Sequence, residues 1–149
     1  MMNLYSCICL VLFALLVLGN AASAQSTSAE RKPVLEALRQ HMQRDIGGKV
    51  TFTNVQYGYQ NGWAFVSATP RRPGGRAGKA INWRKTRYAE AVREGIFDEG
   101  VIALLGKTGT TWSVVEYVVG PTDVPYGCWW KQHGAPKTIF PYTEDSCDY

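Results

Sequence analysis

Two apolar runs joined by a glycine-bearing turn occupy residues 100–119 and predict the centre of the fold. In the first run, residues 101–105, both alternating sets of positions are apolar, which is typical of a strand buried on both faces. Residues 107–110 make the turn. The return run places Trp112, Val114, Glu116 and Val118 on one predicted face and Ser113, Val115, Tyr117 and Val119 on the other. Glu116 is the polar exception, so we expect that part of the strand to meet solvent or a partner.

A similar pair of runs lies earlier in the chain, at residues 49–57 and 63–69. In the first of these, Val50 and Phe52 alternate with Thr51, Thr53, Val55 and Tyr57. Asn61-Gly62 lies in the connection and is a strong hairpin-turn signal. In both hairpins a tryptophan follows the turn. The two hairpins together predict one antiparallel sheet of about four strands.

An amphipathic helix is predicted before the first hairpin, over residues 30–46. Val34, Leu38, Met42 and Ile46 recur every four residues and would form one apolar stripe. Ser28 is the predicted N-cap, Pro33 would lie in the first turn, and glycines 47 and 48 would end the helix. His41 falls beside the stripe, and we interpret it as a boundary residue because no second polar group is predicted near it.

Two shorter helices complete the predicted α+β fold, in which the N-terminal helix packs on the sheet. One covers residues 86–94, with Tyr88, Ala91 and Val92 facing inward. The other, capped by Thr122, covers residues 124–133 and ends at Gly134, and residues 137–142 follow as an extended piece.

The N-terminus has the pattern of a secretory signal peptide. Residues 10–18 are all apolar, and Ala22-Ser23-Ala24 follows as a cleavage signal, although no Lys or Arg precedes the apolar run. We therefore expect residues 1–24 to be the signal peptide and residues 25–149 to be one domain, periplasmic or secreted. The apolar run is too short for a stable membrane anchor, so no transmembrane segment is expected after cleavage.

Cys128 and Cys147 are the cysteines left in the predicted mature chain. An isolated pair in an exported protein predicts one disulfide. On the loop-entropy account, such a bridge contributes about 3 kcal/mol. Two Cys and two distant His match no metal-ligand spacing, so neither a metal site nor a cofactor is expected.

Positive charge is concentrated in residues 70–94, which hold eight basic and two acidic residues in a chain of net charge +4. Within them, residues 70–79 form a Pro/Gly-rich basic loop containing Arg71, Arg72, Arg76 and Lys79. Clustered guanidinium groups bind carboxylates and phosphates through forked hydrogen bonds, so this loop is a candidate anion-binding surface. The alternative is a solvated loop whose charge aids solubility. Nucleic acid is disfavoured as a partner because the chain carries no nucleic-acid-binding motif.

The second candidate site comprises Trp129, Trp130 and His133, near Asp123. Adjacent tryptophans on a helix point in different directions, and an exposed one beside a polar group suits a binding hot spot. The alternative is a Trp-rich helix that covers the end of the sheet. No motif of a serine hydrolase, zinc protease, P-loop enzyme or dinucleotide-binding enzyme is present, so no catalytic residues are assigned and an enzyme is disfavoured.

Five fragments resemble small secreted or periplasmic bacterial proteins of uncharacterised function: residues 63–66, 103–105, 112–116, 120–124 and 129–136. The resemblance implies a periplasmic protein and carries over no catalytic residues. The leading hypothesis is an exported non-enzymatic binding protein, an inhibitor or immunity-type partner of another secreted protein. One alternative is a small-ligand binder or small enzyme with a pocket between helix and sheet. Another is an envelope-associated protein that binds anionic glycan or lipid.

Overall fold

The computed structural model describes residues 19–147, with side chains from residue 28 onward. The chain divides into two units, Met1–Lys32 and Pro33–Tyr149, and the second contains the whole sheet. The apolar run of residues 10–18, on which the predicted signal peptide depends, lies outside the described residues. Within the described part of the chain, no helix has both the length and the apolar character needed to cross a membrane.

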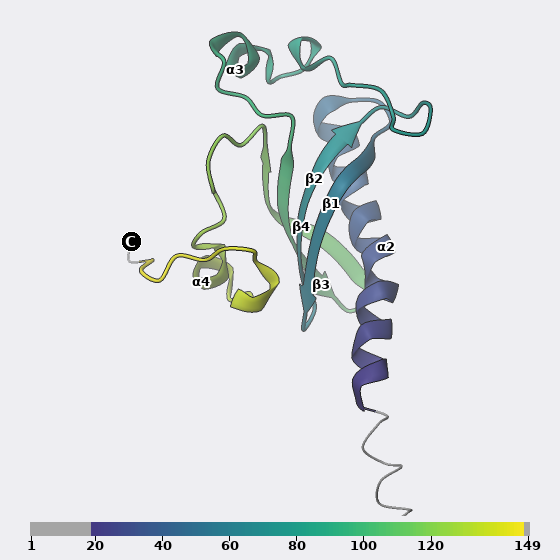
Figure 1. The fold of residues 1–149 in the computed structure, drawn as a ribbon, viewed down its shortest axis with the longest axis vertical. Helices are drawn as coiled ribbons and strands as arrows, with labels where there is room; N and C mark the ends of the chain where they lie inside the picture. The colour runs from purple at the N-terminus through teal and green to yellow at the C-terminus, as the bar shows by residue number, and fades with distance from the viewer. Residues whose placement is uncertain (1–18, 148–149) are drawn as a thin grey trace, which may run out of the picture. The chain divides into compact units, whose positions relative to one another are not determined.

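A four-stranded antiparallel sheet, with its strands in chain order, forms the centre of the second unit (Figure 1). Its strands are β1 (Thr51–Gln60), β2 (Trp63–Arg71), β3 (Val101–Thr108) and β4 (Thr111–Val119). The two hairpins are those predicted, and β2 pairs with β3 between them. Every residue from Val101 to Leu105 is buried, which confirms that this strand is covered on both faces.

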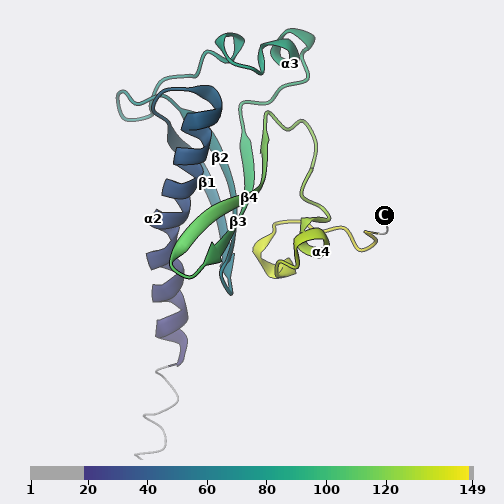
Figure 2. The same cartoon turned by 180° about the vertical axis from the view of Figure 1, so that it is seen from behind.

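Each face of the sheet carries its own apolar core. On one face Val34, Leu38 and Met42 of helix α2 (Gly19–Ile46) are fully buried against the sheet. On the other face Phe65 and Leu104 pack against the C-terminal segment, residues 120–147, which contains helix α4 (Trp129–His133). Within the second unit, the sheet thus lies between residues 33–46 of α2 and the C-terminal segment, and Figure 2 shows the two from behind. The α+β fold and the packing of the N-terminal helix on the sheet are confirmed.

Both outer strands contain a bulge that the alternation of residues did not reveal. In β1 the pairing shifts between Thr53 and Gln56, and Asn54 takes a positive φ of 51°. In β4 the pairing shifts opposite Leu104 and Leu105, so that Val115 is an extra residue and is 41% exposed.

The predicted faces of these two strands are therefore wrong beyond each bulge, because an extra residue reverses the alternation of side chains. Tyr57 lies on the same face as Phe52 and packs with it on the α2 core. Tyr117 and Val119 likewise share the α2 face with Trp112 and Val114.

For the helices, the predicted C-terminal ends agree with the structure better than the predicted N-terminal starts. Glycines 47 and 48, both with positive φ, follow α2 as predicted. The helix is already formed at Gly19, the first described residue, which corrects the predicted start at residue 30; Pro33 therefore lies inside the helix and Ser28 does not cap it. The added stretch is rich in alanine, the best helix former.

The remaining helices are shorter than predicted. Helix α3 spans Ala89–Glu94, after a 3-10 turn at Trp83–Lys85. Helix α4 begins at Trp129 and not at residue 124, because Pro125 and Gly127 interrupt the preceding stretch, which forms turns. Gly134 ends α4 in the left-handed conformation, as predicted. A 3-10 turn at Lys137–Ile139 lies within the piece that was predicted to be extended.

Candidate functional site

The segments that contain the basic residues of the middle of the chain lie at one end of the sheet, where α2 ends and the chain between β2 and β3 folds (Figure 1). We call residues 44–49 and 70–94 the basic end. It contains three acidic residues, Asp45, Glu90 and Glu94, and ten basic ones, namely Arg44, Lys49, Arg71, Arg72, Arg76, Lys79, Arg84, Lys85, Arg87 and Arg93. Because the whole chain has a net charge of only +4, the rest of it is net negative. Glu99 lies just beyond these ranges and pairs with Arg71, so the acidic residues are not wholly excluded from this end.

The predicted basic loop is a small closed hairpin rather than a free loop. Arg72 and Lys79 exchange two backbone hydrogen bonds of 2.8 Å at its base. Gly78 has a φ of 70°, and a Cβ at this position would lie 2.9 Å from the Arg72 carbonyl oxygen, so the turn requires glycine. The backbone therefore fixes the direction in which this loop extends.

The four predicted anion-binding residues of the loop divide into two pairs. The Arg72 guanidinium donates hydrogen bonds to the carbonyl oxygens of Gly47 (2.6 Å) and Lys49 (3.1 Å), just beyond the C-terminus of α2. A cation is favourable there because helix C-terminal carbonyls carry partial negative charge. Arg71 forms an ion pair with Glu99 at 3.4 Å. Arg76 and Lys79 remain exposed and present their charge to solvent.

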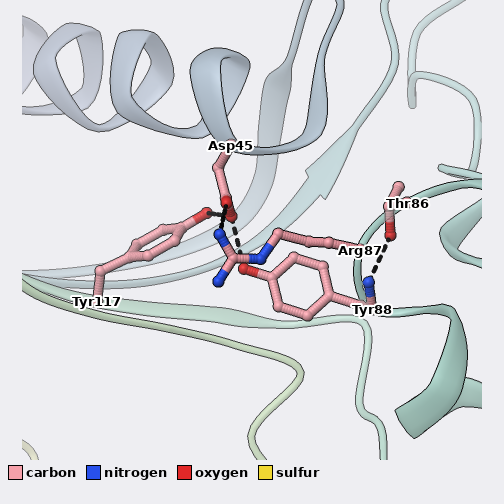
Figure 3. Close-up of polar contacts among 5 residues, drawn as sticks. All are labelled: Asp45, Thr86, Arg87, Tyr88 and Tyr117. Carbon is pink, nitrogen blue, oxygen red and sulfur yellow. Dashed lines mark hydrogen bonds and ion pairs between the residues drawn. The ribbon is translucent and has the colours of Figure 1, made fainter.

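A buried carboxylate anchors the rest of the basic end (Figure 3). Asp45, in the last turn of α2, has a side chain that is only 10% exposed. Its Oδ1 accepts a hydrogen bond from Arg87 at 2.8 Å, and its Oδ2 accepts from the hydroxyls of Tyr88 at 2.5 Å and Tyr117 at 3.4 Å. One carboxylate therefore joins α2, the segment before α3 and strand β4.

The ionisation states of this cluster follow from burial. Burial and the hydrogen bond to Asp45 raise the pKa of Tyr88. Burial, followed by the nearby Tyr88 and Asp45, raises the pKa of Tyr117. Both hydroxyls are therefore protonated donors at neutral pH. Burial and the neighbouring Arg44 lower the pKa of His41 below 6.5, and Asp45 opposes this shift.

Two shallow hollows adjoin the cluster and share His41 and Arg44. The first, of about 320 Å³, is lined by His41, Arg44, Asp45 and Arg87. The second, of about 220 Å³, lies between α2 and β4 and is lined by Ala37, Gln40, His41, Arg44, Trp112, Ser113 and Val114. The His41 ring packs edge-on against Tyr117, with centroids 4.7 Å apart. We call the two together the His41 groove.

Reasoning from the sequence missed this groove. His41 is half-buried, as expected of a boundary residue, but polar groups do surround it. The signal that was present is the spacing of His41 and Asp45, which are four residues apart and so lie on one helix face. Arg87 and Tyr117 are distant in the sequence, and only the tertiary fold brings them to Asp45.

The second candidate site is largely part of the core. Trp129 is 4% exposed and packs in the core beneath the C-terminal segment. Trp130 is half-buried, and the Lys137 ammonium lies 3.9 Å from its ring centroid. His133 Nε2 lies 3.1 Å from Glu116 Oε2, so the polar exception in the apolar run of β4 has a partner in α4. The predicted disulfide between Cys128 and Cys147 is confirmed and fixes this segment.

A third hollow, of about 360 Å³, lies where the C-terminal segment crosses β1, and Phe65, Ile139, Phe140 and Pro141 line it. Gly58 allows this crossing, because a Cβ there would lie 2.0 Å from the Ile139 carbonyl oxygen. Over residues 19–147, the one group with metal-ligand proximity is Cys128, Glu144 and Cys147, and the disulfide occupies both of its sulfur atoms.

Comparison with known proteins adds no relative: no protein-family description, curated protein or solved structure matches this chain.

Proposed function

We propose that this chain is an exported, non-enzymatic binding protein that engages an acidic protein partner through its basic end, as an inhibitor or immunity-type protein does. The observation that carries the proposal is the excess of ten basic over three acidic residues at one end of the sheet. A patch of one sign attracts a partner of the opposite sign and accelerates association.

Two ion pairs reduce the positive charge of this surface, and several basic side chains outside these pairs remain exposed. Asp45 pairs with Arg87, and Glu99, just beyond the basic end, pairs with Arg71. The exposed basic residues include Arg76, Lys79, Arg84, Lys85 and Arg93. These side chains offer their charge to a partner.

Export is supported by two features of the chain. Its N-terminal pattern is that of a secretory signal. The disulfide of the C-terminal segment is of a kind that persists in oxidising compartments. A periplasmic or secreted location fits both.

A pocket-based function has less support. Val34, Leu38 and Met42 are fully buried and fill the middle of the interface between α2 and the sheet, where such a pocket was considered, and the His41 groove is an open hollow at its edge. His133 contacts Glu116 and is not joined to Ser113 or Asp123 by any hydrogen bond found among the described residues. A binding surface therefore suits the geometry better than an enclosed site.

Charge reversal tests the proposal. Protein captured from secreted or periplasmic extract by the wild type is identified, purified and measured against two variants of equal net charge. One reverses Arg76 and Lys79 to Glu in the basic end, and the other reverses Arg31 and Lys32, which are exposed and lie outside it.

We expect the affinity to fall at least about tenfold for the first variant and to stay within about twofold for the second. Equal affinities would overturn the proposal. Salt-sensitive binding to phosphatidylglycerol vesicles, without capture of any protein, would replace the protein partner with an anionic lipid surface.

A further inference from the structure

The arginine that faces the His41 groove is held in a fixed orientation with spare donors. One guanidinium nitrogen of Arg87 donates a hydrogen bond to Asp45, and the guanidinium lies over the Tyr88 ring, 5.4 Å from its centroid. Its side chain is nevertheless 69% exposed. A guanidinium carries five N–H donors in a planar fork, so most of them remain available to a ligand. Asp45 and Tyr88 thus hold Arg87 in place without saturating it.

A second guanidinium faces the same hollow. Arg44 and His41 both line it from α2, and no hydrogen bond or ion pair is found for Arg44 among residues 28–147. The one negative group of the hollow is Asp45, which is almost buried and already accepts from three donors. The hollow therefore has two guanidinium groups and an imidazole around one compensated carboxylate.

We propose that the His41 groove binds a single carboxylate of the acidic partner, between Arg44 and Arg87, with an adjacent apolar group beside Trp112 and Val114. The fork of an arginine matches the two oxygens of a carboxylate. The second hollow of the groove supplies the apolar contact, because Trp112, Val114 and Ala37 line it. This inference rests on the proposed function and places one carboxylate-binding site, the His41 groove, within the basic end.

The apolar part of the groove distinguishes an organic carboxylate from inorganic phosphate. Attraction to the two arginines and repulsion from Asp45 both scale with the charge of the anion, so charge alone does not decide between them. A carboxylate attached to a ring also contacts Trp112 and Val114, and inorganic phosphate does not. Phosphate is therefore expected to bind more weakly than phenylacetate here.

The probe is phenylacetate, which joins one carboxylate to one aromatic ring, titrated into the full-length secreted protein and followed by NMR. Benzyl alcohol serves as the neutral control ligand, and inorganic phosphate is the second anion. We expect amide shifts confined to residues around His41, Arg44 and Arg87 with phenylacetate, and weaker or absent shifts with the other two ligands.

The matched variants are Arg87→Gln and Arg84→Gln, since both remove one exposed charge from the basic end and only the first lies in the groove. Arg87→Gln is expected to weaken phenylacetate binding about tenfold, and Arg84→Gln to change it less than about twofold. Equal effects of the two variants, tighter binding of phosphate, or no phenylacetate shifts would each overturn the carboxylate-binding site.

The His41 imidazole gives a second readout. Arg44, Arg87, Asp45 and the Tyr117 ring are the charged and titratable groups around it. An anion bound beside it favours the protonated ring, so its NMR-monitored pKa is expected to rise with phenylacetate and to stay fixed with benzyl alcohol.

Partner capture separates this inference from the proposed function. If Arg87→Gln leaves capture intact while reversal of Arg76 and Lys79 abolishes it, the groove fails and the basic end stands. If neither change affects capture, the proposed function itself fails.

Discussion

Two long segments leave the sheet, one between β2 and β3 and one after β4, and they are anchored in different ways. The first, residues 72–100, contributes two buried apolar side chains, Ile81 and Trp83, and its helix α3 has no buried residue. Partly buried Tyr88, Val92 and Phe97 also pack against the α2 core, and Arg87 and Tyr88 add polar bonds to Asp45. The second, residues 120–147, is held by a separate apolar core and a disulfide.

The difference shows which segment leaves its characteristic side chains exposed. In the second segment, the core buries Trp129 and, in part, Trp130. In the first segment, the anchor consists of a few aromatic residues and the bonds to Asp45, and it leaves Arg84, Lys85 and Arg93 exposed. The Trp-rich segment is therefore mostly held in a core, and the basic segment keeps its charged side chains on the surface.

The strongest test of this comparison is Trp129→Ala. We expect it to lower the free energy of unfolding by about 3–5 kcal/mol, because a buried aromatic side chain is removed from the second core. Urea denaturation measures the change. Tyr142→Ala, at a position that is 52% exposed, should change stability by less than about 0.5 kcal/mol. A loss below about 1 kcal/mol for Trp129→Ala would show that the C-terminal segment is not anchored by this core.

Removing the disulfide should have the next largest effect. The double variant Cys128→Ser and Cys147→Ser is expected to lose about 3 kcal/mol, because the unfolded chain regains the freedom of the closed loop. Hydrogen exchange should quicken over residues 129–140 and remain unchanged over residues 81–97. Equal acceleration in both ranges would contradict independent anchoring of the two segments.

The converse change is Asp45→Asn, which keeps the shape of the side chain and removes its charge. We expect a loss of about 1–3 kcal/mol, because Arg87 and the two tyrosine hydroxyls lose a charged acceptor. Exchange should now quicken over residues 83–97 and not over residues 129–140. Asp98→Asn, at an exposed position, is the matched control and should change neither stability nor exchange.

The alternation of residues was sufficient to predict the sheet and insufficient to predict the site. Local sequence patterns predicted the two hairpins, the apolar stripe of α2 and the end of α4 at Gly134, because each of these depends on residues that are close together in the chain. The bulges at Asn54 and Val115 escaped prediction because a single inserted residue leaves the run of strand-forming residues intact. Asp45, Arg87 and Tyr117 escaped because their meeting depends on where the segment between β2 and β3 folds back onto α2.

The smallest expected effect concerns pH. Because the pKa of His41 is lowered in the folded protein, the unfolded chain binds a proton more readily as the pH falls through 6.5. Stability contributed by neutral His41 is thus present above that pH and declines below it. His41→Gln should flatten the decline in thermal midpoint between pH 7 and pH 5. An unchanged or steeper decline would contradict the lowered pKa.

The bulges in β1 and β4 affect how the edge strands of two copies of the chain can pair. Those strands are the two edges of the sheet, and an edge with a long regular row of unpaired backbone groups can recruit the edge of another chain. Each bulge divides that row into short stretches and adds local twist. Two copies brought edge to edge therefore cannot match their hydrogen-bonding rows over a full strand, which disfavours open-ended strand addition between chains.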